Sequence, residues 1–210
     1  MKAIIFDLDG VIVFTDKFHY QAWKEIADRM DIYFDETIND RLRGVSRAES
    51  LEIILERYEG LLTQAEKEAL MKDKNESYRR RLATMTPGDI TEETRDTLEK
   101  LRKSGFKLAI GSSSKNAGFI LEKTGLSDLF DAVSDGNNIT RSKPDPEVFL
   151  NAAVLLGVAP ENCAVVEDAG AGIEAAKAAG MVAIGIGGAS EHAATDFAIS
   201  SLSELTRIFD

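Results

Sequence analysis

Apolar and polar positions divide this chain into two kinds of segment. Short, continuous apolar runs occur at residues 3–6, 107–111, 130–134, 164–167, 182–186 and 197–199. Runs of this length are typical of strands that are buried on both faces of a parallel sheet. We therefore expect a parallel sheet that includes a strand at the very start of the chain.

Between most of these runs, apolar residues follow the helical period instead. The predicted helices cover 92–104, 115–124, 146–156, 171–179 and about 202–208. Four of them end at a glycine, a residue suited to the left-handed position after a helix: Gly105, Gly125, Gly157 and Gly180. Regular alternation of strands and helices predicts an α/β fold, with a Rossmann-like parallel sheet and helices on both of its faces.

The stretch from about 16 to 82 contains helical patterns only. One helix carries Trp23 on its apolar face, a second runs over 47–58, and a third opens at Thr63 with a capping box to Glu66 and continues to about 82. The first strand must join a sheet whose other strands follow this block. We therefore expect an inserted all-helical cap domain at 15–86, with an α/β core domain formed by 1–14 and 87–210.

Composition and charge narrow the class of protein. The chain of 210 residues is 44% hydrophobic and 29% charged, as in soluble globular proteins. Its net charge of −11 argues against a nucleic-acid partner, because such a surface repels a phosphate backbone. The run Arg79-Arg80-Arg81 is interpreted as cations that favour the end of a helix. The single cysteine, Cys163, lies in an apolar run and is predicted to be a core thiol.

The chain shows no secretory segment and no apolar run near eighteen residues. We therefore expect a cytoplasmic protein with no membrane association, and a monomer by default.

Polar residues follow four of the predicted strands: Asp7 and Asp9, Ser112, Lys143, and Glu167 with Asp168. Open α/β sheets bind ligands at the carboxyl ends of their strands, where these groups would meet. Two carboxylates two positions apart let one attack while the other moves a proton. Taken singly, each group has an ordinary structural interpretation, as a turn, a helix start or a surface lysine. Together they favour phosphoryl transfer.

These residues also resemble a known family. Asp7-Leu8-Asp9-Gly10-Val11, Ser112, Lys143-Pro144 and Glu167-Asp168 resemble the four motifs of the haloacid dehalogenase superfamily, over essentially the whole chain. Further residues resemble its β-phosphoglucomutase branch: His19, Trp23, Gly44-Val45-Ser46-Arg47, Lys74-Asn75, Ser114-Lys115-Asn116 and Ser142-Lys143-Pro144-Asp145-Pro146.

The resemblance implies roles for the strand-end residues. Asp7 would be the nucleophile and Asp9 the general acid and base. Mg²⁺ would be bound by Asp7, Asp168 and the backbone carbonyl of Asp9, with Glu167 supporting it directly or through water. Such oxygen ligands are those that Mg²⁺ prefers. Ser112, the backbone N–H of Ser113, and Lys143 would hold the transferring phosphoryl group.

The resemblance also implies residues for the rest of a sugar phosphate. Arg47 from the cap, with Ser114, Lys115 and Asn116 from the core, would bind a second phosphate group. The residues that would face the sugar are His19, Trp23 and Lys74, together with the loop Gly44, Val45 and Ser46. Two of these residues have an alternative interpretation: Trp23 also suits the core of the cap, and Arg47 could be a solvated arginine.

The implied activity is the interconversion of β-D-glucose 1-phosphate and glucose 6-phosphate through an aspartyl phosphate and the 1,6-bisphosphate. Two alternatives stay open: a sugar-phosphate phosphatase of the same superfamily, and a silent sugar-phosphate-binding protein. The chain departs from the family pattern at Phe14, where an aspartate is usual, and at Glu92-Glu93, where Pro-Gly is usual at the second hinge. Both departures concern cap closure, which must exclude water.

Overall fold

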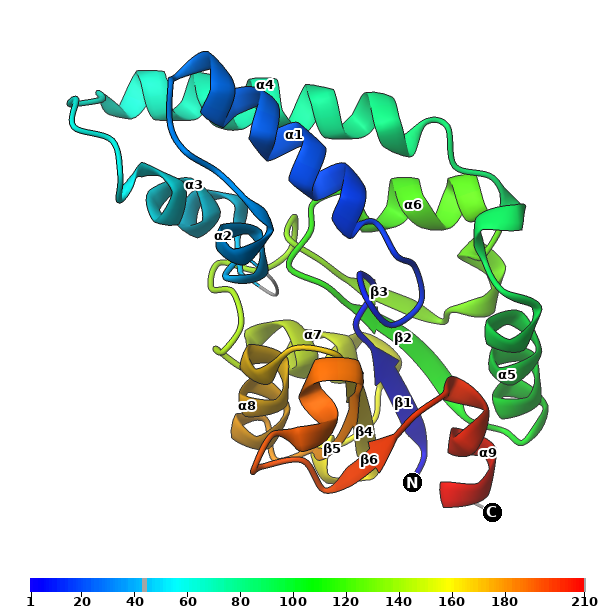
Figure 1. Ribbon diagram of the computed structural model, residues 1–210. Helices are drawn as coiled ribbons and strands as arrows, with labels where there is room; N and C mark the ends of the chain where they lie inside the picture. Colours follow the sequence, from blue (N-terminus) through cyan, green and yellow to red (C-terminus); the bar gives the residue numbers. More distant parts are fainter. Residues whose placement is uncertain (43–44, 210) are drawn as a thin grey trace.

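The sheet is the centre of the fold. The computed structural model describes residues 1–42 and 45–209, and within them the strands form one six-stranded parallel sheet in the order β3-β2-β1-β4-β5-β6 (Figure 1). The strands are β1 (Ala3–Phe6), β2 (Lys107–Gly111), β3 (Ala132–Ser134), β4 (Cys163–Glu167), β5 (Val182–Ile186) and β6 (Phe197–Ile199). The predicted fold class is confirmed.

The first strand lies inside the sheet, between β2 and β4. All of its residues are buried. Ile4 and Phe6 point into one apolar cluster, and Ala3 and Ile5 into another on the opposite face, as the two-residue period of a strand requires. The next residue, Asp7, therefore emerges at the carboxyl edge of the sheet. Cys163 is buried in the second cluster, as predicted.

Helices cover both faces of the sheet. They are α5 (Glu92–Lys103), α6 (Ala117–Thr124), α7 (Glu147–Leu156), α8 (Gly170–Ala178) and α9 (Leu205–Ile208). Apolar residues of α5, α6 and α9 belong to the first cluster, and those of α7 and α8 to the second. Helix α6 begins two residues later than predicted, because the hydroxyl of Ser112 accepts the N–H of Ser114 and holds the chain in a turn. Strand β3 also begins two residues late, after a 3-10 turn at Ser127–Leu129.

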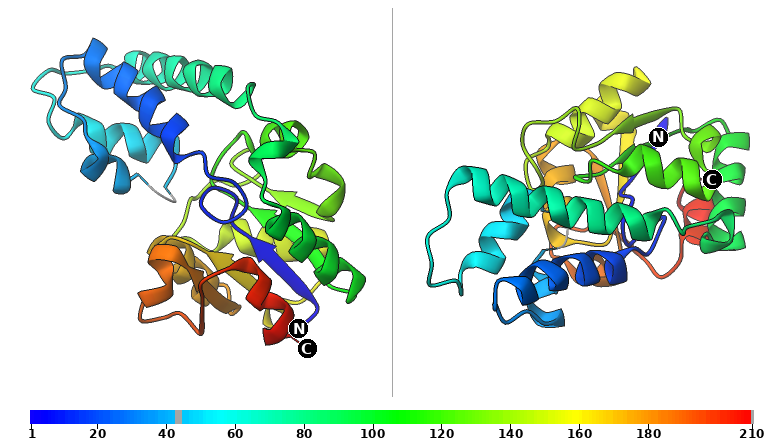
Figure 2. Two further views of the ribbon diagram at one scale, coloured as in Figure 1. Left: turned by 45° about the vertical axis from the view of Figure 1, so that its right-hand side comes forward. Right: turned by 90° about the horizontal axis from the view of Figure 1, so that it is seen from above.

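A block of four described helices lies across the carboxyl ends of the strands (Figures 1 and 2). They are α1 (Asp16–Arg29), α2 (Glu36–Asp40), α3 (Arg47–Leu55) and α4 (Gln64–Leu82). Helix α4 has the predicted capping box between Thr63 and Glu66. Helix α3 ends at Leu55, earlier than predicted, and α2 was not predicted as a separate helix. None of the helices in the described ranges is long and apolar enough to cross a membrane.

The chain passes between the helical block and the sheet twice. At the first passage, the side chain of Phe14 is 68% exposed and does not pack between the layers. The second passage runs from the end of α4 to a 3-10 turn at Pro87–Asp89. Glu92 and Glu93, the second departure from the family pattern, follow this turn and form the first turn of α5, where acids favour the helix dipole and where the predicted helix begins. The division into domains at 15–86 stays a prediction.

Candidate active site

The turn after β1 brings Asp7 and Asp9 to the edge of the sheet. Asp7 donates its backbone N–H to the carbonyl of Val166 on β4, at 2.9 Å. Gly10 follows with a φ of 97°, and a Cβ built there would lie 2.2 Å from Oδ2 of Asp168. Glycine is therefore required here for two reasons: the left-handed backbone and the close approach of the Asp168 carboxylate.

Three carboxylates meet at this edge. Asp7, Glu167 and Asp168 each offer an oxygen atom, and these atoms lie within 4.8 Å of one another. One oxygen of Glu167 accepts the backbone N–H groups of Asp168 and Ala169 at 3.0 and 3.1 Å, so Glu167 also stabilises the turn into α8. A hard divalent cation fits this donor set, which consists of oxygen atoms in a mostly buried position.

A buried lysine lies among these acids. The side chain of Lys143 is fully buried, and its ammonium group donates to Asp7 and Glu167. Burial opposes its charge, but the two carboxylates outweigh this effect and raise the pKa of Lys143. Burial raises the pKa of Asp7 to about 7, and Glu167 adds to the rise while Lys143 opposes it. The acids outnumber the lysine, so a bound cation would relieve their mutual repulsion.

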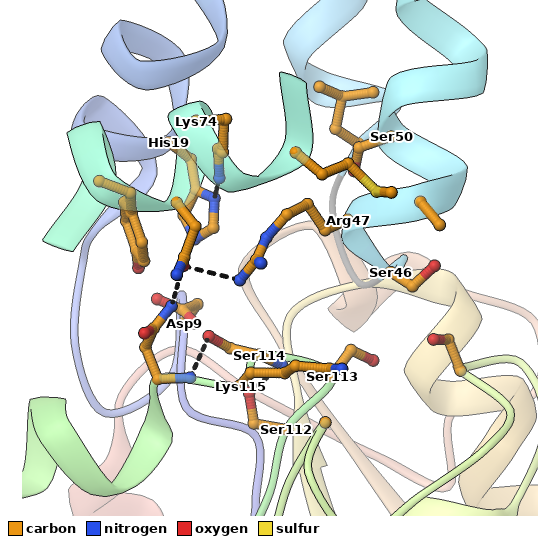
Figure 3. Close-up of a pocket in the computed structure, with 18 of the residues that line it drawn as sticks. Asp9, His19, Ser46, Arg47, Ser50, Lys74, Ser112, Ser113, Ser114 and Lys115 are labelled. Carbon is orange, nitrogen blue, oxygen red and sulfur yellow. Dashed lines mark hydrogen bonds between the residues drawn. The ribbon is translucent and has the colours of Figure 1, made fainter. Parts of the chain in front are cut away.

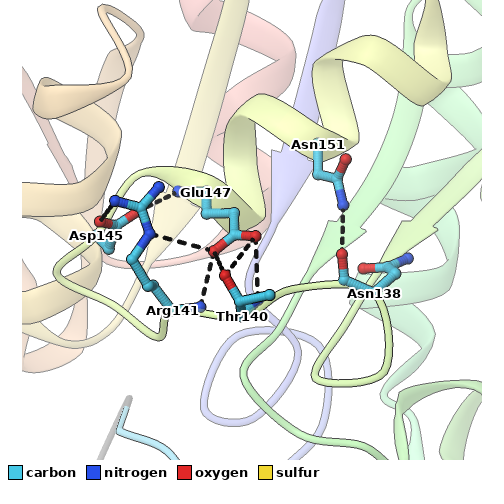
Figure 4. A network of polar contacts seen from close by, with 6 residues as sticks. All are labelled: Asn138, Thr140, Arg141, Asp145, Glu147 and Asn151. Atoms are coloured by element: carbon cyan, nitrogen blue, oxygen red, sulfur yellow. Dashed lines mark hydrogen bonds and ion pairs between the residues drawn. The ribbon is translucent and has the colours of Figure 1, made fainter.

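Hydrogen bonds connect the loop that carries Lys143 to the start of α7 (Figure 4). The carboxylate of Glu147 accepts the backbone N–H of Thr140 at 3.0 Å and of Arg141 at 2.7 Å, and also the hydroxyl of Thr140. Asp145 accepts the N–H of Glu147 and pairs with Arg141, both at 3.0 Å. Glu147 was missed in the sequence, where it looks like an ordinary acid in the first turn of a helix.

Hydrogen bonds link Asp9 to the helical block. The hydroxyl of Thr15 donates to Asp9, and the hydroxyl of Tyr78 on α4 donates to Thr15 at 3.0 Å. Burial, and then the charge of Asp7, raise the pKa of Asp9 to about 7. A carboxyl group with such a pKa can be either protonated or ionised at neutral pH, as an acid and base must be.

His19 and Lys74 form a pair above Asp9 (Figure 3). Nδ1 of His19 lies 2.9 Å from Nζ of Lys74, which also lies 4.6 Å from the ring centre of Tyr78 and 5.0 Å from that of Trp23. Burial, reinforced by the charge of Arg47, lowers the pKa of Lys74 to about 7. Burial also lowers the pKa of His19 well below its usual value. Trp23 itself is buried in the apolar core of the helical block, in agreement with its alternative interpretation.

A chain of side-chain hydrogen bonds joins the helical block to the sheet layer. Arg47 on α3 donates to Oδ1 of Asn75 on α4 at 2.7 Å. Asn116, at the start of α6, donates to the same oxygen at 3.0 Å. Arg79 on α4 donates to Oδ1 of Asn116, also at 3.0 Å. The interpretation of Arg79 as a cation that only favours its helix end is therefore incomplete, because it contacts the other layer.

These groups surround one cavity of about 580 Å³ between the two layers (Figure 3). Most of the predicted site residues line it: Asp7, Asp9, His19, Trp23, Ser46, Arg47, Lys74, Ser112, Ser113, Ser114, Lys115, Asn116, Glu167 and Asp168. Among the described residues, Lys143 and Val45 are outside this lining, although the ammonium group of Lys143 contacts Asp7. Gly44 lies outside the described residues. The roles of all these residues stay predictions at this point.

Comparison with known proteins identifies a family and several relatives that this chain resembles. The haloacid dehalogenase-like hydrolase family matches residues 1–180. The chain is 44% identical to a β-phosphoglucomutase of Bacillus subtilis (strain 168), over 98% of this chain and 92% of that protein. It is 32% identical to a fructose-1-phosphate phosphatase of Escherichia coli (strain K12), over 88% of this chain and 95% of that protein.

A solved structure is also similar. The crystal structure of a β-phosphoglucomutase from Clostridium difficile superimposes with a TM-score of 0.92 at 36% identity, over all of this chain and 95% of that one. The family match covers most of the sequence. The chain belongs to the haloacid dehalogenase-like hydrolase family.

Proposed function

We propose that this enzyme interconverts β-D-glucose 1-phosphate and glucose 6-phosphate through a phosphorylated Asp7 and β-glucose 1,6-bisphosphate. The observation that supports the proposal is that one cavity is lined by two separate groups of side chains that can donate hydrogen bonds to a phosphate group. The first group lies beside Asp7 at the strand ends. The second is formed by Arg47 with Ser114, Lys115 and Asn116. A substrate with one phosphate needs only the first group, whereas a bisphosphate intermediate uses both.

In the first half-reaction, phosphorylated Asp7 transfers its phosphoryl group to the 6-hydroxyl of β-glucose 1-phosphate. The bond between phosphorus and the Asp7 oxygen breaks, the bond to the sugar oxygen forms, and Asp9 takes the hydroxyl proton. The bisphosphate then reorients within the cavity. In the second half-reaction Asp7 attacks the phosphorus at position 1, and the bond between that phosphorus and the sugar oxygen O1 breaks. Asp9 returns the proton to O1, and glucose 6-phosphate leaves.

The remaining strand-end groups would stabilise the phosphoryl group during its transfer. Lys143, Ser112 and the backbone N–H of Ser113 are the proposed donors to its oxygens. Asp7, Asp168 and the backbone carbonyl of Asp9 would hold Mg²⁺, with support from Glu167. When bound, the ion would offset the repulsion between an anionic carboxylate and an anionic phosphoryl group.

The helical block is the proposed cap, with its limits at 15–86. It brings Arg47, His19 and Lys74 to the cavity, where they would face the sugar phosphate and exclude water from the phosphorylated Asp7. The departure at Phe14 does not obstruct this role, since its side chain points to solvent.

A phosphatase is the second candidate. It would use the same Asp7 and Asp9 and pass the phosphoryl group to water. The similarity to the phosphatase of E. coli, whose name specifies fructose 1-phosphate, favours it. The second group of phosphate ligands argues against it. A silent binding protein is less consistent with the geometry, because sensing requires neither a nucleophile nor a carboxyl group with a raised pKa.

The test supplies β-glucose 1-phosphate, Mg²⁺ and a trace of the 1,6-bisphosphate, and follows glucose 6-phosphate and free phosphate in parallel. We expect glucose 6-phosphate to form far faster than free phosphate, and both to vanish with Asp7→Asn. Free phosphate alone would establish the phosphatase. Neither product, with retained binding of the sugar phosphate, would establish the silent binder.

A further inference from the structure

We infer that Arg79, which lies outside the cavity, is a positioning residue that makes the second phosphate site selective for bisphosphates. The inference rests on the proposed function and concerns how that site obtains its hydrogen-bond donors. Arg79 is an exposed residue of α4, and its guanidinium carbon lies 4.3 Å from the ring centre of Phe119 on α6. Its side chain contacts one lining residue, Asn116, by a hydrogen bond.

Asn116 uses both ends of its side-chain amide. The side chain is buried, with the residue only 3% exposed. Its oxygen accepts from Arg79, and its NH₂ group donates to Asn75. An arginine carries donors and no acceptor, so the oxygen of Asn116 must face Arg79. The NH₂ group of Asn116 is thereby directed at Asn75.

The same constraint passes on to Asn75. Its amide oxygen already accepts from Asn116 and from Arg47, so its NH₂ group must point elsewhere. Asn75 lines the cavity. The oxygen of Asn75 is thus held between two donors, and Asn116, which also lines the cavity, turns its NH₂ group rather than its oxygen toward Asn75. An oxygen of Asn116 turned to that side would repel a phosphate, so the orientation of Asn116 favours an anion.

Arg79 and Arg47 are the two charged ends of this chain of hydrogen bonds, and Arg79 is the one that acts on Asn116. Without Arg79, the amide of Asn116 loses the donor that holds its oxygen, whereas Arg47 still holds the oxygen of Asn75. The orientation of Asn116 would then be selected by weaker contacts. The effect is directed at the second site, since Arg79 contacts Asn116 and the ring of Phe119. It also depends on apposition of the cap and core, because Arg79 and Asn116 belong to different layers.

The test compares Arg79→Met and Arg79→Glu with Arg80→Met and Arg80→Glu. Arg80 is the exposed neighbour on the same helix, so each pair makes the same change of charge. The variants are made with Asp7→Asn, and binding of β-glucose 1,6-bisphosphate is followed by the fluorescence of Trp23, the chain's single tryptophan, which lines the cavity. Buffers contain at least physiological salt, because salt screens distant charges.

We expect Arg79→Met to weaken bisphosphate binding about tenfold, which corresponds to about 1.4 kcal/mol. Arg79→Glu should weaken it further, because its carboxylate accepts from the NH₂ group of Asn116 and so turns the amide of Asn116 around. Arg79→Lys should recover most of the loss, since it restores a donor. The Arg80 variants should bind within about twofold of the parent.

A second measurement separates the two phosphate sites. With Asp7 intact, the rate of acetyl phosphate hydrolysis reports on the strand-end site alone, and it should be equal in all of the variants. Equal bisphosphate binding by the Arg79 and Arg80 pairs would overturn the inference, as would a parallel loss of acetyl phosphate hydrolysis in Arg79→Met. If the parent itself bound no bisphosphate while still hydrolysing acetyl phosphate, the proposed mutase would fail, and the inference with it.

Discussion

The sharpest consequence of this geometry concerns Gly10→Ala. The added Cβ would lie 2.2 Å from Oδ2 and 2.5 Å from Cγ of Asp168. A normal contact between such atoms is about 3.5 Å, so the Asp168 carboxylate or the turn must move by about 1 Å. The backbone φ of 97° adds strain of about 1–2 kcal/mol for a residue with a Cβ.

The two costs act on different quantities. Backbone strain lowers the free energy of unfolding, and in a chain of this size the melting temperature should fall by about 2–8 °C. Displacement of a carboxylate by about 1 Å disturbs the proposed Mg²⁺ site and the path of the phosphoryl group. We therefore expect kcat/KM to fall about a hundredfold, and the Mg²⁺ concentration for half-maximal rate to rise about tenfold or more.

Gly105→Ala is the matched control. Gly105 has a similar φ of 89°, and in the described part of the chain no atom lies within 4 Å of its added Cβ. It should show a similar loss of melting temperature, with kcat/KM and Mg²⁺ dependence unchanged. The reasoning is refuted if Gly10→Ala keeps wild-type Mg²⁺ dependence, or if both variants lose activity equally.

Three further predictions follow from other contacts. Gly172→Ala should lose activity, because its Cβ would lie 1.9 Å from Cδ of the glutamate that ends β4. In Gly118→Ala, where no described atom lies within 4 Å of the added Cβ, activity should persist and the free energy of unfolding measured in urea should rise by about 1 kcal/mol. Inactivation of both variants would contradict this. Glu147→Ala should lower kcat about tenfold with little change in KM, because it releases the loop that carries Lys143. Glu204→Ala is the control: it removes matching contacts to two N–H groups and a hydroxyl at another place in the fold, and it should leave kcat unchanged. Equal losses of kcat in these two variants would contradict the role given to Glu147. Burial holds the pKa of Lys74 at about 7 in the folded protein, below its unfolded value of about 10.4. Between these two pH values the unfolded state binds more protons than the folded state. The free energy of unfolding therefore rises with pH, by up to about 1.4 kcal/mol per pH unit. Urea unfolding from pH 7 to 9 should show this slope in the wild type and a shallower one in Lys74→Met; equal slopes would refute it.

The sequence alone determined the strands, most of the helices and the polar residues that follow the strands. Apolar runs predicted every strand of the sheet, and the glycines at 105, 125, 157 and 180 marked helix ends, because burial on both faces and left-handed backbone leave a local trace. The capping box at Thr63 was equally readable. The acids after β1 and β4 could be grouped from their positions along the chain, since parallel strands end at one edge of a sheet.

The tertiary structure decided which donor faces which acceptor. Lys143 reaches Asp7 across 136 positions, and their contact depends on strand order rather than on any local pattern. Glu147 and Arg79 have side chains that suit ordinary helix ends, so nothing near them in the sequence distinguishes a solvated charge from one that holds a catalytic loop or orients an amide. Residue type specifies what a group can donate or accept, but only the packing of two layers determines the partner that lies within about 3 Å of it.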